Sequence, residues 1–129
     1  MNTCEILNNS KTIAVVGISK NPSRISRMVT DYLINNGYKI VGVNPGKPKI
    51  NDIDIYANLK EIPFKIDIVN VFRKSEDIPL LIPDVLEVNP KVLWLQLGIR
   101  NDDAVIPVVE KGITTIQDRC IKIEHGMCF

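Results

Sequence analysis

The sequence predicts an α/β fold in which one domain covers residues 1–129. Segments with the apolar character of strands alternate along the chain with segments that have helical periodicity. Apolar runs at residues 13–16, 66–71 and 92–95 are typical of strands that are buried on both faces. This alternation indicates a parallel sheet with right-handed crossovers, and we expect five strands in the order 3-2-1-4-5, counted along the chain.

The expected elements follow one another from the first strand to a short terminal segment. Strands are predicted at residues 12–16, 38–43, 66–72, 91–96 and 113–117. Helices are predicted at 22–36, 76–88 and 101–111, and Gly37 and Gly112 end the first and the last of them. Pro83 should shorten or kink the middle helix. A loop is expected at 44–58, a single helical turn at 59–62, and a short terminal element at 119–128.

Composition and charge exclude several classes of protein. A chain of 129 residues with 45% hydrophobic and 24% charged residues is typical of one globular domain with a real core. The net charge of +1 gives no sign of a nucleic-acid partner. No apolar run reaches transmembrane length, and the polar start of the chain does not resemble a signal peptide. Cys4, Cys120 and Cys128 form an odd set without framework spacing, which indicates the reducing cytoplasm.

The most informative segment is the turn between the first predicted strand and the first predicted helix. Backbone N–H groups at a helix N-terminus lack partners, and the helix dipole favours negative charge there. Gly17 opens the turn, and Ser19 and Ser23 offer hydroxyl donors. Pro22 suits a first helical turn, and Arg24 offers a planar fork that matches phosphate. The segment predicts a nucleotide-like ligand, although an ordinary turn with a serine cap explains it about as well when taken alone.

Polar and aromatic side chains follow the other strands at the same edge of the predicted sheet. They are Asn44, Pro45 and Lys47 after the second strand, Phe72 and Arg73 after the third, and Gln96 after the fourth. A site for NAD usually has an acidic residue after the second strand and three glycines in the first turn. Neither is present, and the lysine favours a ligand with an extra phosphate. Each segment alone also fits an ordinary turn or strand end, so their convergence carries the prediction.

Several motifs together resemble a known family. They are Val-Gly-Ile-Ser at 16–19, Pro-Ser-Arg at 22–24, Val-Asn-Pro at 43–45, Val-Phe-Arg at 71–73, Trp-Leu-Gln-Leu-Gly at 94–98 and Asp-Arg-Cys at 118–120. From about residue 10 to 125 the chain closely resembles the small single-domain CoA-binding proteins, which are similar to the N-terminal CoA-binding domain of succinyl-CoA synthetase α subunits. The resemblance implies a Rossmann-like three-layer sandwich that binds coenzyme A or acyl-CoA.

The resemblance also implies roles for the residues at the ends of the strands. The first turn, residues 17–24, would hold the pyrophosphate of CoA, and residues 44–47 would border its adenosine phosphate end. Phe72 and Arg73 would form a wall of the cleft beside the ligand. Gln96 would close the cleft from the fourth strand.

The same resemblance argues against an enzyme. Ligases of that class pass phosphate through a histidine on a second domain, whereas we expect one domain here, with a lone His125 in a surface or packing position. No catalytic residue is therefore predicted. Cys120, His125 and Cys128 lack the fourth ligand that a structural zinc site needs, so no metal is predicted either. Cys120 is expected to be a small buried residue.

Two classes of function stay open, together with a third interpretation. The first is a CoA or acyl-CoA binding module without chemistry of its own, which carries or senses CoA or hands it to an unidentified protein partner. The second is an NAD(P)-binding regulatory or redox-sensing domain, in which Lys47 and Arg73 would meet the 2′-phosphate of NADP. The third is a domain that has lost its ligand and contacts other proteins, since one fold hosts many functions.

Overall fold

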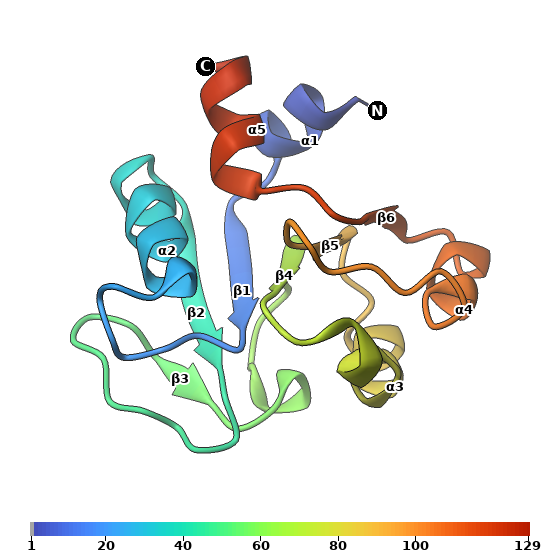
Figure 1. Cartoon of the computed structure of the whole chain (residues 1–129), viewed down its shortest axis with the longest axis horizontal. Helices are drawn as coiled ribbons and strands as arrows, with labels where there is room; N and C mark the ends of the chain where they lie inside the picture. The colour runs from blue at the N-terminus through green and yellow to red at the C-terminus, as the bar shows by residue number, and fades with distance from the viewer. Residues whose placement is uncertain (1) are drawn as a thin grey trace.

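In the computed structural model, which describes residues 2–129, a six-stranded parallel sheet forms the centre of the chain (Figure 1). Its strands are β1 (Thr12–Val16), β2 (Lys39–Val43), β3 (Ile55–Tyr56), β4 (Ile68–Val71), β5 (Val92–Leu95) and β6 (Thr114–Ile116). Every residue of β4 and β5 is buried, as the continuous apolar runs predict for strands covered on both faces. The α/β class and the parallel sheet are confirmed.

The strand order is β3-β2-β1-β4-β5-β6, which corrects both the number and the order of the predicted strands. The predicted third strand is β4, and it pairs with β1, where Ile68 lies opposite Ile13, rather than with β2. The position beyond β2 belongs to β3, which pairs Ile55 with Gly42 inside the predicted loop. The chain therefore changes direction across the sheet between β1 and β4, and ligands of open α/β sheets bind at such a point.

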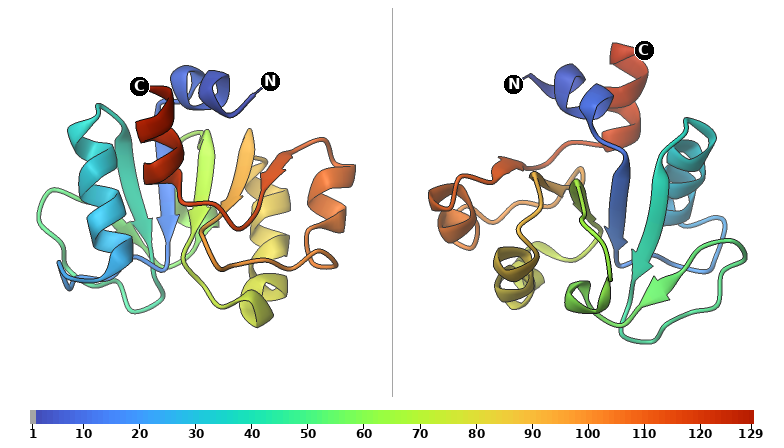
Figure 2. Two further views of the ribbon diagram at one scale, coloured as in Figure 1. Left: turned by 45° about the horizontal axis from the view of Figure 1, so that its top comes forward. Right: turned by 180° about the vertical axis from the view of Figure 1, so that it is seen from behind.

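Helices cover both faces of the sheet (Figure 2). One face carries α1 (Thr3–Asn9), α2 (Ile25–Asn35) and α5 (Ile121–Cys128); the other carries η1 (Leu59–Glu61), α3 (Ile78–Val88) and α4 (Ile106–Glu110). A further turn, η2 (Ser75–Asp77), leads into α3. Alternate residues of β1 point to opposite faces, so that Ile13 packs with the first group and Ala14 with the second. The result is the expected Rossmann-like arrangement of a sheet between two layers of helices.

Each predicted helix begins later than expected, and the predicted helix at 101–111 is reduced to α4 at Ile106–Glu110. α2 begins at Ile25 rather than at Pro22, and it ends before Gly37, whose φ of 91° only glycine adopts readily. α3 continues through Pro83 to its predicted end at Val88. α1 is absent from the prediction, although it begins with an N-cap residue, Asn2, whose Oδ1 accepts the Glu5 N–H and whose Nδ2 donates to the Glu5 carboxylate.

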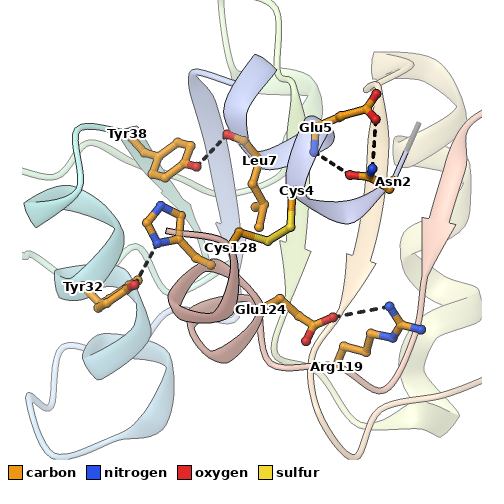
Figure 3. Close-up of a disulfide and its surroundings, with 10 residues drawn as sticks. Asn2, Cys4, Glu5, Leu7, Tyr32, Tyr38, Arg119, Glu124 and Cys128 are labelled. Atoms are coloured by element: carbon orange, nitrogen blue, oxygen red, sulfur yellow. Dashed lines mark hydrogen bonds and ion pairs between the residues drawn. A yellow bond between two sulfur atoms is a disulfide. The ribbon is translucent and has the colours of Figure 1, made fainter.

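A disulfide joins the first helix to the last (Figure 3). Cys4 and Cys128 are 124 residues apart in sequence. The odd number of cysteines and the lack of a framework spacing therefore did not indicate this bond. Cys120 is free and buried, as predicted. His125 has the predicted packing role, because it is buried on α5 with its Nδ1 2.7 Å from the Tyr32 hydroxyl. Within residues 2–129, no helix is long and apolar enough to cross a membrane.

Candidate functional site

Gly17 directly follows β1, where hydrogen bonds tie the end of this strand to both of its neighbours. Its N–H donates to the Val43 carbonyl of β2 at 2.8 Å, and the next hydrogen bond across the sheet runs from the Phe72 N–H to the Val16 carbonyl, also at 2.8 Å. A Cβ atom at Gly17 would lie 2.4 Å from the Phe72 carbonyl oxygen, and the φ of Gly17 is 87°. Only glycine fits here, and it lets the ends of three strands meet under the first turn.

The turn that follows is held rigid by its own polar groups. The Ser19 N–H donates to the Ser26 hydroxyl at 3.1 Å, and the Ser19 hydroxyl accepts the Asn21 N–H at 3.1 Å. Asn21, which the sequence analysis does not single out, also accepts both the N–H and the hydroxyl of Ser23. Arg27 donates to the Lys20 carbonyl at 2.9 Å. The Ser23 hydroxyl is therefore occupied within the turn, and Pro22 lies in the turn rather than in the helix.

The first turn of α2 faces a cleft with no acidic side chain in its lining. Arg24 stands at the N-cap without a side-chain hydrogen bond, and no acidic residue lies in the first helical turn. The cleft encloses about 790 Å³ and is lined by Gly17, Ile18, Ser19, Lys20, Arg24, Ile25, Ser26, Asn44, Gly46, Pro48, Phe72 and Lys74. Three of these residues are exposed cations, so the helix dipole and the side chains both favour an anion here.

Asn44 supports the cleft through its side chain. Its Nδ2 donates to the Ile18 carbonyl at 3.0 Å, and its Oδ1 accepts the Gly46 N–H at 2.9 Å. The carboxamide thus ties the end of β2 to the first turn and to its own loop. Pro45 and Lys47 do not line the main cleft. Pro45 lines a cavity of about 370 Å³ beside α3, and Lys47 lies along the outer loop that leads to β3.

Gln96 is buried and connects β5 to its neighbours. Its Oε1 accepts the Asn70 Nδ2 of β4 at 3.2 Å and the backbone N–H of Ile121 at 3.0 Å, which starts α5. It lines a separate cavity of about 430 Å³ together with Arg73. Gln96 therefore positions α5 at the edge of the sheet, a role that the sequence does not reveal.

The predicted site residues fall into two groups. The main cleft brings together Gly17, Ser19, Arg24, Asn44 and Phe72. Outside its lining lie Pro22, Ser23, Pro45, Lys47, Arg73 and Gln96. Two further cations line the main cleft but are not among the predicted site residues: Lys20, inside the first turn, and Lys74, two positions after the predicted third strand.

The groups with shifted pKa values lie at the opposite, amino end of the strands. Burial alone would raise the pKa of the Asp67 carboxyl, but N–H donors of Lys11 and Thr12 and the Lys91 ammonium hold that pKa below its usual value. Burial lowers the pKa of His125. The lining of the main cleft contains no histidine, cysteine or carboxylate, and no group of three potential metal ligands occurs within residues 2–129. The charged side chains in the lining of the main cleft are all cations.

Fold and cleft together define a Rossmann-like α/β domain with a cationic cleft where the strand order reverses. The model of the CoA-binding domain family matches residues 11–126 of the chain. The chain belongs to this family, as the sequence motifs predict.

Relatives of the chain include short proteins and one part of a ligase. The uncharacterized protein YneT of Bacillus subtilis is 45% identical over 123 residues, which cover 95% of this chain and 91% of YneT. A solved structure from Thermus thermophilus is 36% identical and matches all of both chains with a TM-score of 0.94. The alpha subunit of ADP-forming acetate–CoA ligase I from Pyrococcus furiosus is 29% identical; the match covers 95% of this chain and 25% of that subunit. The domain is thus also a component of ligase enzymes.

Proposed function

We propose that the protein binds coenzyme A or acyl-CoA in the main cleft and acts as a non-catalytic module that carries or senses the ligand or delivers it to a protein partner. One observation carries the proposal: the Gly17 junction opens the N-terminus of α2 into a cleft lined by Lys20, Arg24 and Lys74 and by no carboxylate. CoA presents a pyrophosphate and a further phosphate on its ribose, so it matches both the dipole and the cations.

The pyrophosphate is assigned to the first turn. There the backbone of residues 17–20 and the start of α2 face the cleft, and Arg24 lies at the helix N-cap. Lys74, which follows the end of β4, adds a third cation to the lining of the cleft. We assign the adenosine end to the side of Asn44, Pro45 and Lys47, and Phe72 and Arg73 to the wall between the cavities.

The contents of the main cleft support a role without chemistry in that cleft. Acid–base or covalent catalysis needs a titratable or nucleophilic group within reach of the reacting atoms. The lining of the main cleft offers none of the histidine, cysteine or carboxylate groups that most often serve. The ligase subunit that contains a similar domain is about four times as long, so most of that subunit has no counterpart in this alignment. We place this function in the cytoplasm, where the Cys4–Cys128 bond would have to persist or form against reducing conditions.

Isothermal titration with CoA, acetyl-CoA, NADP and NAD tests the proposal. We expect CoA and acetyl-CoA to bind and the nicotinamides to give little heat, because β2 ends without an acid and both ends of the Asn44 carboxamide are occupied. Tight binding of NADP or NAD instead would favour the redox-sensing alternative. No binding of any of the four would favour a domain that only contacts proteins.

Charge variants locate the site within the fold. Arg24→Ala and Lys74→Ala should each lower the affinity for CoA by about tenfold or more, since hydrogen bonds to charged groups contribute about 1.5–3 kcal/mol. The loss should shrink as salt is added. Lys65→Ala is the matched control, because this exposed lysine precedes β4 at the far end of the sheet. Equal affinities for all three variants and the parent would refute the assignment of the phosphates to this cleft.

A further inference from the structure

A second cavity adjoins the main cleft at the same edge of the sheet. It encloses about 430 Å³, and its walls are mainly apolar, with Leu97 after β5 and Ile123 on α5 among them. It shares Ile25, Phe72 and Lys74 with the main cleft, so the two cavities adjoin along these side chains. We term this second cavity the apolar pocket.

The rim of the apolar pocket exposes large aliphatic side chains to water. Ile25 is 65% exposed, Leu97 62% and Ile123 54%. They come from the start of α2, the loop after β5 and the first turn of α5, yet all three line the same cavity. Single exposed apolar residues are common, but several that gather around one concave space are typical of a ligand site.

Gln96 supplies a polar group that the fold leaves unused in this pocket. Its oxygen must face the backbone N–H of Ile121, which can only donate, and it also accepts from Asn70. The Nε2 end is therefore a fixed donor, and none of the side-chain hydrogen bonds found within residues 2–129 uses it. The residue itself is only 4% exposed. Nε2 is not among the buried side-chain atoms that lack a partner, so it keeps contact with solvent in the pocket, where a ligand acceptor such as a carbonyl oxygen can replace water.

We propose that the apolar pocket receives the acyl group of a short, apolar acyl-CoA, with the thioester carbonyl beside Gln96 Nε2. This inference rests on the proposed binding of CoA in the main cleft, because the apolar pocket adjoins that cleft and lies within reach of a thioester on the bound CoA. It adds a substrate class, since it predicts that aliphatic thioesters bind more tightly than CoA itself.

A series of thioesters measures the contribution of the pocket. Acetyl-, propionyl-, butyryl- and hexanoyl-CoA are titrated into the protein beside CoA. Each added methylene should tighten binding about fourfold until the pocket is full. S-butyl-CoA, a thioether without the carbonyl oxygen, should bind about two- to tenfold more weakly than a matched thioester, as expected for one lost hydrogen bond. Succinyl-CoA ends in a carboxylate, and binding at least as tight as butyryl-CoA would overturn the preference for an apolar acyl group.

A pair of matched variants separates the pocket from the rest of the molecule. Ile123→Ser should remove most of the dependence on chain length and leave the affinity for CoA unchanged. Ile106→Ser is the control, because Ile106 is also helical and 50% exposed but lies on α4, outside the apolar pocket. If CoA binds and the series is flat in the parent protein, or equally steep in Ile123→Ser, the acyl inference is wrong and the proposed function stands. If neither CoA nor any thioester binds, both are wrong.

Discussion

The glycine at the end of β1 allows a sharp test of how the edge of the sheet is closed. In Gly17→Ala the new methyl group would lie 2.4 Å from the Phe72 carbonyl oxygen, at a φ of 87°. The left-handed backbone alone costs about 1–2 kcal/mol for a residue with a side chain. Relief of the contact must move the end of β4 away from β1 and strain the hydrogen bond between Phe72 and Val16, and overpacking of this kind costs about 1–3 kcal/mol more.

A second glycine isolates the backbone contribution. Gly112 has a φ of 90°, but a Cβ there would meet no atom within 4 Å. Gly112→Ala should therefore lose only about 1–2 kcal/mol, and Gly17→Ala about 2–5 kcal/mol. Urea unfolding measures the difference, which corresponds to a midpoint lower by about 1 M for each 2 kcal/mol at a typical slope. Equal midpoints for the two variants would refute the steric argument at Gly17.

Three further predictions concern the disulfide and the amino end of the strands. Reduction, or Cys4→Ser, should lower the free energy of unfolding by up to about 5 kcal/mol, because the bond closes a loop spanning 124 positions; coincident urea curves with and without reductant would contradict this. The pKa of Asp67 is lowered in the fold, so its stabilisation is complete above its unfolded value near pH 4 and is lost as the pH falls through the lower folded value; Asp67→Asn should show a shallower acid limb, and an unchanged limb would count against it. Burial lowers the pKa of His125, so stability should begin to fall below about pH 6.5, where the unfolded chain takes up a proton first; thermal melts of His125→Gln should lack this part of the profile.

The long apolar strands were predictable, and the order of the sheet was not. β1 from Ile13 onward, β4 and β5 are buried, so their sequences are almost continuously apolar, with Asn70 as the one polar residue, and this pattern marks them clearly. β3 has only two residues, Ile55 and Tyr56, too few to show an alternation, and it lies in a polar loop. Because the prediction lacks β3, it counts residues 66–72 as the third strand. It therefore places this strand beside β2, whereas the structure places it beside β1. Counting β3 as the third strand yields the observed order.

The site was predictable where backbone geometry decides it and not where side-chain partners do. Gly17 and Arg24 follow from the strand-to-helix turn itself, which a sequence displays directly. The roles of Asn44 and Gln96 depend on carbonyl and N–H groups that lie 25 or 26 positions away in the chain. The Cys4–Cys128 bond depends in the same way on α1, which the prediction lacks, and on the packing of α1 against α5.

The same bond sets the path by which a mechanical load would cross the molecule. The α-carbons of Cys4 and Cys128 are 5.5 Å apart, so a force applied through residues on either side of the pair passes through two sulfur atoms and bypasses the sheet. In this state a pull on the ends would extend the chain hardly at all. Once the bond is reduced, the same pull acts on every strand, and the segment between the two cysteines, with its sequence separation of 124, can extend by about 400 Å. The intact disulfide between the two helices would thus carry the load, and after reduction the folded domain would carry it instead.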